Sequence, residues 1–128
     1  MTTLLLDTHV FLWWAGGTAA IPRPVVTQLE ADGQTLLMSA VSVWEITTKV
    51  RLGKLPPVGD LGALLARSNV AVIPIDYQDA KLAGEMEGEH RDPFDRMIVA
   101  QARLRNIGLV SVDTALDVFP IRRLWPHA

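Results

Sequence analysis

The sequence predicts an α/β fold, a three-layer α/β/α sandwich around a mainly parallel central sheet, formed by a single domain that spans residues 1–128. The first observation behind this prediction is that short apolar runs alternate with stretches of helical periodicity, as in chains built from strand–helix–strand units. The second is length, because 128 residues support one hydrophobic core and are too few for two. The third is that neither a repeat nor a low-complexity linker divides the chain.

Four apolar runs are expected to be buried strands. Residues 4–6 are three consecutive leucines that end at a polar residue, which suits a central parallel strand covered on both faces. The other runs are residues 36–39, 70–75 and 109–112. Residues 118–124 are expected to add a short edge strand.

Helices are expected between these strands. Three of them end at glycine, which favours helix termination, and they span residues 10–15, 22–32 and 41–52. Residues 60–68 form a shorter helix, and Asp76 caps another that runs to about residue 84. Residues 85–91 are polar and charged, which indicates a surface loop.

The helix that follows this loop has the clearest start signal in the chain. Proline suits the first helical position because it has no amide hydrogen to leave unpaired, so Pro93 is expected there with Asp92 as the N-cap. Asp95 then occupies the first turn. Its carboxylate either balances the positive end of the helix dipole or faces a partner outside the helix.

Composition limits the class of protein. Hydrophobic residues make up 49% of the chain and mean hydropathy is +0.23, but no apolar run reaches the roughly 20 residues that span a bilayer. Asp7 interrupts the first apolar stretch, so no export signal is expected. The chain has no cysteine, which makes the cytoplasm the expected compartment. The net charge of −2 does not indicate a broadly nucleic-acid-binding surface, so any such contact must be local.

Four acids lie at predicted junctions between strands and helices: Asp7, Glu45, Asp95 and Asp113. Each has a structural explanation, since Ser42 and Glu45 have capping-box spacing and the three aspartates suit helix starts. However, side chains at the carboxyl ends of parallel strands converge, and clustered carboxylates repel one another unless a cation relieves them. Ligation by oxygen alone favours Mg²⁺ or Mn²⁺ over Zn²⁺.

Other polar residues near these acids are given weaker assignments. His9 and His90 are left outside the catalytic set, because a single loop histidine is more often a plain polar residue. Arg91 and Arg96 flank the Asp95 turn, where each either holds a substrate phosphate or pairs with a carboxylate. Lys49 belongs to a basic cluster that is expected to be a solvated face.

Four stretches resemble the PIN-domain ribonucleases, and among them the VapC-type toxins of bacterial toxin–antitoxin pairs. They are residues 4–9 (LLLDTH), 39–46 (SAVSVWEI), 90–102 (HRDPFDRMIVAQA) and 109–113 (LVSVD). The resemblance implies that Asp7, Glu45, Asp95 and Asp113 bind metal, with Asp92 as an extra acid. It also implies that Thr8 is the small hydroxyl residue after the first acid. Ser111 departs from the pattern, because many relatives carry threonine there, but it keeps a hydroxyl.

The function that the resemblance implies is a metal-dependent endoribonuclease toxin of a type II toxin–antitoxin system, neutralised by a cognate antitoxin. Bound Mg²⁺ or Mn²⁺ would activate water for attack on an RNA phosphodiester and stabilise charge on the phosphate. The expected partners are RNA, the antitoxin and a second copy of the chain, as a homodimer or within a toxin–antitoxin hetero-oligomer, with no membrane.

Three other classes of protein share part of this pattern. A phosphorylation-receiver domain has acids around Mg²⁺, but needs an acidic doublet after the first strand, where Asp7 stands alone. A haloacid-dehalogenase-type phosphatase needs Asp-x-Asp, and the third position here is His9. A non-catalytic PIN-like module that binds RNA or protein remains open, although the four acids argue against it.

The tryptophans predict a partner surface. Trp13, Trp14 and Trp44 are expected on two helices beside Asp7 and Glu45. Neighbouring helix positions point about 100° apart, so Trp13 and Trp14 are not expected to face one core together. An exposed apolar groove near the acids is therefore expected, and the resemblance implies that an antitoxin segment occupies it.

Overall fold

The computed structural model describes residues 2–17 and 19–126, and its centre is a five-stranded sheet in the order β3-β2-β1-β4-β5. Every neighbouring pair of strands is parallel. The strands are β1 (Thr2–Leu6), β2 (Gln34–Ser39), β3 (Val70–Ile73), β4 (Gly108–Val110) and β5 (Arg123–Leu124). The predicted parallel sheet is confirmed, with β1 in the middle as its leucine run indicated.

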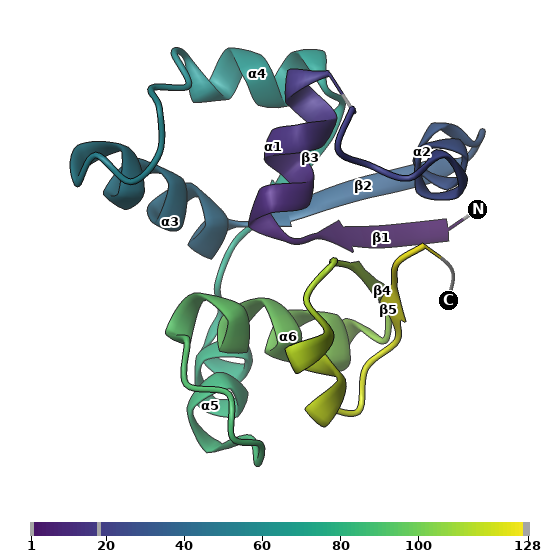
Figure 1. Ribbon diagram of the computed structural model, residues 1–128. Coiled ribbons are helices and arrows are strands. Elements are labelled where there is room, and N and C mark those ends of the chain that lie inside the picture. Colours follow the sequence, from purple (N-terminus) through teal and green to yellow (C-terminus); the bar gives the residue numbers. More distant parts are fainter. Residues whose placement is uncertain (1, 18, 127–128) are drawn as a thin grey trace.

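Helices cover both faces of this sheet, as predicted. They are α1 (Thr8–Gly16), α2 (Arg23–Glu30), α3 (Ala40–Arg51), α4 (Leu61–Arg67), α5 (Tyr77–Glu85) and α6 (Pro93–Arg105), followed by the 3₁₀ helix η1 (Thr114–Val118). Figure 1 shows α1, α2 and α4 on one side of the sheet and α5 and α6 on the other, while α3 extends beyond the carboxyl ends of the strands. Among the described residues, no helix combines the length and apolar character needed to cross a membrane.

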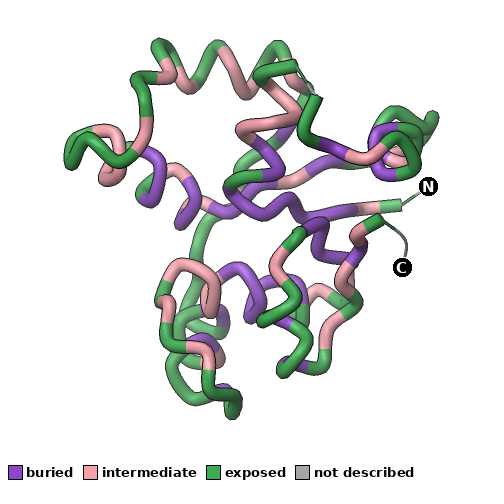
Figure 2. The backbone as a smooth tube through the Cα atoms, in the orientation of Figure 1, coloured by how far each residue is buried: buried purple, intermediate pink, exposed green. Residues whose placement is uncertain are grey.

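The alternation of side chains along β1 divides the core into two clusters. Leu4 and Leu6 pack into the cluster beneath α1 and α2, whereas Leu5 packs into the cluster beneath α6. All three leucines are completely buried, and the burial-coloured tube shows the middle of the sheet as its most buried part (Figure 2). A continuous apolar run is therefore what this central position requires.

Several predicted boundaries differ from the structure. The third strand ends at Ile73 because the next residue, Pro74, has no amide hydrogen for the ladder. Val118 ends a 3₁₀ helix, so only Arg123 and Leu124 of the predicted edge strand at residues 118–124 are paired. The fourth strand stops at Val110, two residues earlier than predicted. These differences lie at element ends and leave the layers unchanged.

The strand order creates a crevice at the carboxyl ends of β1 and β4. The chain runs from β1 outward through β2 to β3, and then crosses to the other side of β1 to form β4 and β5. Connections leaving β1 and β4 therefore run on opposite faces of the sheet, the arrangement in which open α/β sheets bind ligands.

Candidate metal centre

A cleft of about 370 Å³ lies at these strand ends, and it brings together all four of the acids singled out from the sequence. The residues that line it are Asp7, His9, Trp13, Glu45, Lys49, Asp92, Asp95, Val112 and Asp113. They come from both halves of the chain and from both faces of the sheet. The predicted convergence of these carboxylates is therefore a feature of the structure.

Asp7 directly follows β1 and is the N-cap of α1. Its Oδ1 accepts from the backbone N–H of Thr8 at 2.8 Å, and its Oδ2 accepts from the Ser111 hydroxyl at 2.7 Å. Burial raises the pKa of the Asp7 carboxyl above its ordinary value of 3.8, and the charge of Glu45 adds to the rise. Its two hydrogen bonds favour the ionised form and so lower the pKa, but by less than burial raises it.

Glu45 occupies a position that the capping-box prediction assigned wrongly. The helix α3 starts at Ala40, and Ser39 is its N-cap through a hydrogen bond from the Val41 N–H. Ser42 therefore lies inside the helix and does not form a capping box with Glu45. Glu45 also lies within a helix and not at a strand end, so it reaches the cleft from the side.

Thr8 links Glu45 to the first strand. Its hydroxyl oxygen lies 2.6 Å from Glu45 Oε1 and 2.8 Å from the Ser42 hydroxyl. Thr8 has one hydroxyl hydrogen and an ionised carboxylate only accepts, so Thr8 donates to Glu45 and accepts from Ser42. The small hydroxyl residue after the first acid thus orients the second acid.

Lys49 forms an ion pair inside the cleft. Its Nζ lies 2.6 Å from Glu45 Oε2, one helical turn away. The hydrogen bond to Glu45 raises the pKa of the Lys49 ammonium, and the charges of Asp92 and Asp95 contribute. Of the described residues that line the cleft, Lys49 is the one lysine or arginine. It therefore offsets part of the charge of five carboxylates.

Asp92 and Asp95 have the helix positions predicted for them. Asp92 is the N-cap of α6, and its Oδ1 accepts from the N–H groups of Phe94 and Asp95. The Asp95 carboxylate faces a partner outside the helix, because its Oδ2 lies 2.7 Å from Nε2 of His90. Burial raises the pKa of Asp95 to about 6, and the nearby charges of Asp7 and Asp92 contribute.

Asp113 completes the cleft from the end of β4. It is the N-cap of η1, where its Oδ1 accepts from the Ala115 N–H at 3.0 Å. A carboxylate oxygen of Asp113, one of Asp95 and a ring nitrogen of His90 all lie within 4.8 Å of one another. Asp7 and Glu45 line the same cleft but lie outside this group of three.

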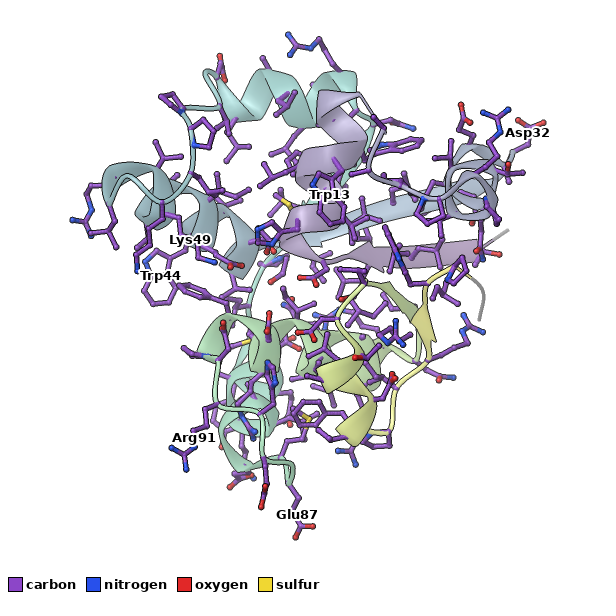
Figure 3. The ribbon with its side chains drawn as sticks, in the orientation of Figure 1. Trp13, Asp32, Trp44, Lys49, Glu87 and Arg91 are labelled. Atoms are coloured by element: carbon purple, nitrogen blue, oxygen red, sulfur yellow. The ribbon has the colours of Figure 1, made fainter. Side chains whose placement is uncertain are left out.

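Neither arginine beside the Asp95 turn pairs with a carboxylate among the described residues, while contact with a substrate phosphate stays a prediction. Arg96 donates to the backbone carbonyls of Ala83, Gly88, His90 and Met86 and pairs with no carboxylate among the described residues. It therefore fixes the loop that precedes α6. Arg91 points away from the molecule (Figure 3).

The contacts of His90 with Asp95 and of Lys49 with Glu45 were not predicted from the sequence. Lys49 follows Glu45 by four residues, a spacing that pairs opposite charges on a helix, and this signal was available. His90 carried no comparable signal. Its approach to Asp95 depends on the path of residues 86–90, which Arg96 determines from within the helix.

Comparisons with known proteins agree with the fold. The sequence matches the PIN domain family over residues 4–121. No curated protein sequence matches the chain significantly.

Three solved structures superpose over nearly their whole length. DNA-bound VapBC from Salmonella typhimurium gives a TM-score of 0.72 at 20% identity, over 96% of this chain and 97% of that chain. VapBC2 from Rickettsia felis, bound to a promoter DNA fragment, gives a TM-score of 0.71 at 17% identity, over 95% of this chain and 97% of that chain. VapC20 from Mycobacterium tuberculosis, a sarcin-ricin loop cleaving toxin, gives a TM-score of 0.64 at 16% identity, over 96% of this chain and 99% of that chain. At identities this low, the likeness shows a shared fold. Together with the family match, which covers almost every residue, it establishes that the chain belongs to the PIN domain family.

Proposed function

We propose that this protein is a metal-dependent endoribonuclease that acts as the toxin of a type II toxin–antitoxin pair. The observation that carries the proposal is the cleft in which Asp7, Glu45, Asp95 and Asp113 converge from different elements. The motif resemblance supports RNA as the substrate, and the structural likeness to VapBC and VapC proteins supports the toxin class.

The residues of the cleft fit a divalent cation. Burial and mutual repulsion raise the pKa values of Asp7 and Asp95, so the ionised carboxylates lack sufficient counter-charge in the metal-free protein. Asp95 and Asp113 present oxygens close enough to share one ion. Carboxylate oxygens suit Mg²⁺ and Mn²⁺. Asp7 and Glu45 line the same cleft and would contribute further carboxylate ligands.

A bound Mg²⁺ or Mn²⁺ supplies an acidified water and charge stabilisation on the phosphate. The chain itself supplies orientation. The hydroxyls of Ser111 and Thr8 fix the carboxylates of Asp7 and Glu45. The Lys49 ammonium supplies a positive charge that a phosphate oxygen can approach. No nucleophilic side chain is required in this scheme.

The nuclease proposal is tested with the purified chain and an RNA mixture. We expect cleavage in Mn²⁺ or Mg²⁺, none after chelation, and a loss of at least about 100-fold with Asp95→Asn. The matched control is Asp117→Asn, because Asp117 is an exposed acid that pairs with Arg123 outside the cleft. Cleavage in the presence of chelator, or full activity of Asp95→Asn, would contradict the proposal. A folded chain that binds RNA but never cuts it would instead identify a non-catalytic binding module.

The proposed partner is a small antitoxin, and the exposed Trp44, which packs on the partly buried Phe94, supports a docking surface beside the cleft. Trp44 is 61% exposed, and its ring meets Phe94 edge to face at 5.1 Å between centroids. Figure 3 shows Trp44 on α3, close to Lys49. Co-expression with the product of the adjacent upstream reading frame is expected to yield a complex in which RNA cleavage is suppressed.

A further inference from the structure

We propose that His90 is a direct nitrogen ligand of the metal, so that one imidazole joins the carboxylates of the cleft, among which Asp95 and Asp113 lie nearest to it. The inference rests on the proposed metal dependence of the cleft and deepens it. It replaces the oxygen-only ligand set expected from the sequence and changes which ions the site prefers.

The distances between the three donors fit a single coordination shell. Around an ion with bonds of about 2.1 Å, octahedral ligands lie roughly 3.0 Å apart when adjacent and about 4.2 Å apart when opposite. His90 Nε2 and Asp95 Oδ2 are 2.7 Å apart, and a ring nitrogen of His90, an oxygen of Asp95 and an oxygen of Asp113 all lie within 4.8 Å of one another. On metal binding, the proton of the His90–Asp95 hydrogen bond would be released to solvent, and a small separation of the two atoms would let both contact one ion.

The ring of His90 is held in place before any ion binds. Arg96 donates to the carbonyl oxygen of His90 at 2.9 Å and to that of Gly88 at 3.1 Å, which fixes the end of the loop. The ring also packs edge to face against Phe119, with centroids 6.2 Å apart. The imidazole is 17% exposed, so it loses little further freedom on coordination.

Close packing of the loop adds to this restraint. Gly88 has a φ of +134°, which residues with a Cβ rarely adopt. A Cβ at this position would lie 2.5 Å from Cε1 of Phe119. The loop thus passes against the ring that supports His90. Its path is determined by contacts with α6 and Phe119, and this path directs Nε2 toward Asp95.

A nitrogen donor predicts a preference among ions. Imidazole suits transition metals, whereas Mg²⁺ favours oxygen ligands throughout. The wild-type chain should therefore bind Mn²⁺ more tightly than Mg²⁺. The ratio of the two affinities should be larger than it would be for a site made of carboxylates alone. The rival role for His90 is to position Asp95 by donating a hydrogen bond without touching the ion, as supporting residues do around many metal sites.

The test is electron spin-echo spectroscopy of Mn²⁺ bound to the full chain, prepared with unlabelled or ¹⁵N-labelled histidine. We expect modulation from a coordinated nitrogen that changes with the isotope. His9 also lines the cleft, so His9→Gln is the matched control and should retain the signal. His90→Gln should lose it and weaken Mn²⁺ binding at least tenfold, with a smaller loss for Mg²⁺.

Each outcome bears on one proposal or on both. If Mn²⁺ binds and the wild type cleaves RNA, but no histidine nitrogen is detected, His90 only positions Asp95 and this inference is overturned. The same holds if the signal persists in His90→Gln. If the folded wild type binds no Mn²⁺, the proposed function fails as well. The isotope experiment uses the unaltered protein, so its result does not depend on the stability of any variant.

Discussion

The hydroxyl of Ser111 lies 2.7 Å from Oδ2 of Asp7, although 104 residues separate them in the chain. The Ser111 hydroxyl oxygen also accepts a hydrogen bond from the backbone N–H of Asp113 at 3.1 Å. One side chain at the end of β4 therefore orients the first acid and the backbone of the last. This contact gives a physical reason for a hydroxyl side chain at position 111.

Ser111→Ala is expected to destabilise the fold by about 1.5–3 kcal/mol, because a buried carboxylate loses a hydrogen-bond donor. It should also weaken Mn²⁺ binding, since Asp7 loses its fixed orientation. Ser111→Thr keeps the hydroxyl and is the matched control. Urea denaturation measures the first effect and calorimetric titration with Mn²⁺ the second. Unchanged values for Ser111→Ala would mean that the contact is not functional.

Asp95→Asn is expected to stabilise the metal-free protein at neutral pH. The pKa of Asp95 is raised from 3.8 to about 6, so the folded state holds a proton more tightly than the unfolded state does. Ionisation therefore costs stability as pH rises from 3.8 to about 6, by about 3 kcal/mol at most. Solvent screening of a side chain that is 18% exposed reduces this to roughly 2 kcal/mol.

The measurement is denaturant unfolding with chelator at pH 7.5 and pH 4. The gain of Asp95→Asn should be present at pH 7.5 and nearly absent at pH 4. The control has the opposite sign, because Arg123 lowers the pKa of Asp117 and Asp117→Asn should lower stability at neutral pH. A destabilised Asp95→Asn protein at pH 7.5 would show that the carboxylate is a structural cap.

Mn²⁺ is expected to raise the melting temperature of the wild type. An ion that binds only the folded state adds RT ln(1 + [L]/Kd), which is about 2.7 kcal/mol at 100 times Kd. The shift should shrink as pH falls and the carboxylates become protonated. Scanning calorimetry with a Mn²⁺ series measures it. A melting temperature indifferent to Mn²⁺ and chelator at neutral pH would count against the metal centre.

Arg96→Lys is expected to loosen the loop before α6 while keeping the charge. A single ammonium cannot reproduce the planar guanidinium, whose nitrogens donate to four carbonyls. We expect a loss of about 1–3 kcal/mol of stability and faster amide exchange at residues 86–90. Arg91→Lys is the control because Arg91 is exposed and points outward (Figure 3). Equal exchange rates in both variants would exclude the restraint.

Trp44→Ala is expected to weaken the antitoxin complex with little effect on the folded toxin. Trp44 is 61% exposed, so its removal creates no cavity. Trp14→Ala should instead cost roughly 3 kcal/mol or more, because Trp14 packs against the core and donates to the Ser68 carbonyl. Unfolding curves and competition binding separate the two effects. An unchanged affinity for Trp44→Ala would place the docking surface elsewhere.

The layers and the start of the helix that carries Asp95 could be predicted because they depend on local signals. The leucine run of β1 and the Asp92-Pro93 start of α6 determine local structure without help from distant residues. The tryptophan prediction was partly wrong, since Trp13 and Trp14 both pack against one core cluster. An indole is large enough to reach that cluster from the edge of the buried helix face. Two tryptophans that point about 100° apart can therefore both contact it.

The contacts within the site were harder to predict because they are not local. Glu45 satisfied a capping-box spacing, yet Ser39 starts the helix and Thr8 holds the carboxylate from 37 residues away. By charge, Arg96 suited either a substrate phosphate or a neighbouring carboxylate. In the structure its guanidinium donates instead to four backbone carbonyls, three of them in the loop before α6. Sequence spacing identifies which groups are chemically able to interact, whereas the tertiary path determines which of them meet.

The strand order also has a consequence for synthesis. Chains are made from the N-terminus, so β1 is synthesised well before its neighbour β4, which begins at Gly108. Asp113 and the Ser111 hydroxyl arrive later still. A nascent chain therefore carries Asp7 and Glu45 long before the other half of the cleft exists. For a protein proposed to cut RNA, the order of translation delays the assembly of the whole site until Asp113 has been synthesised.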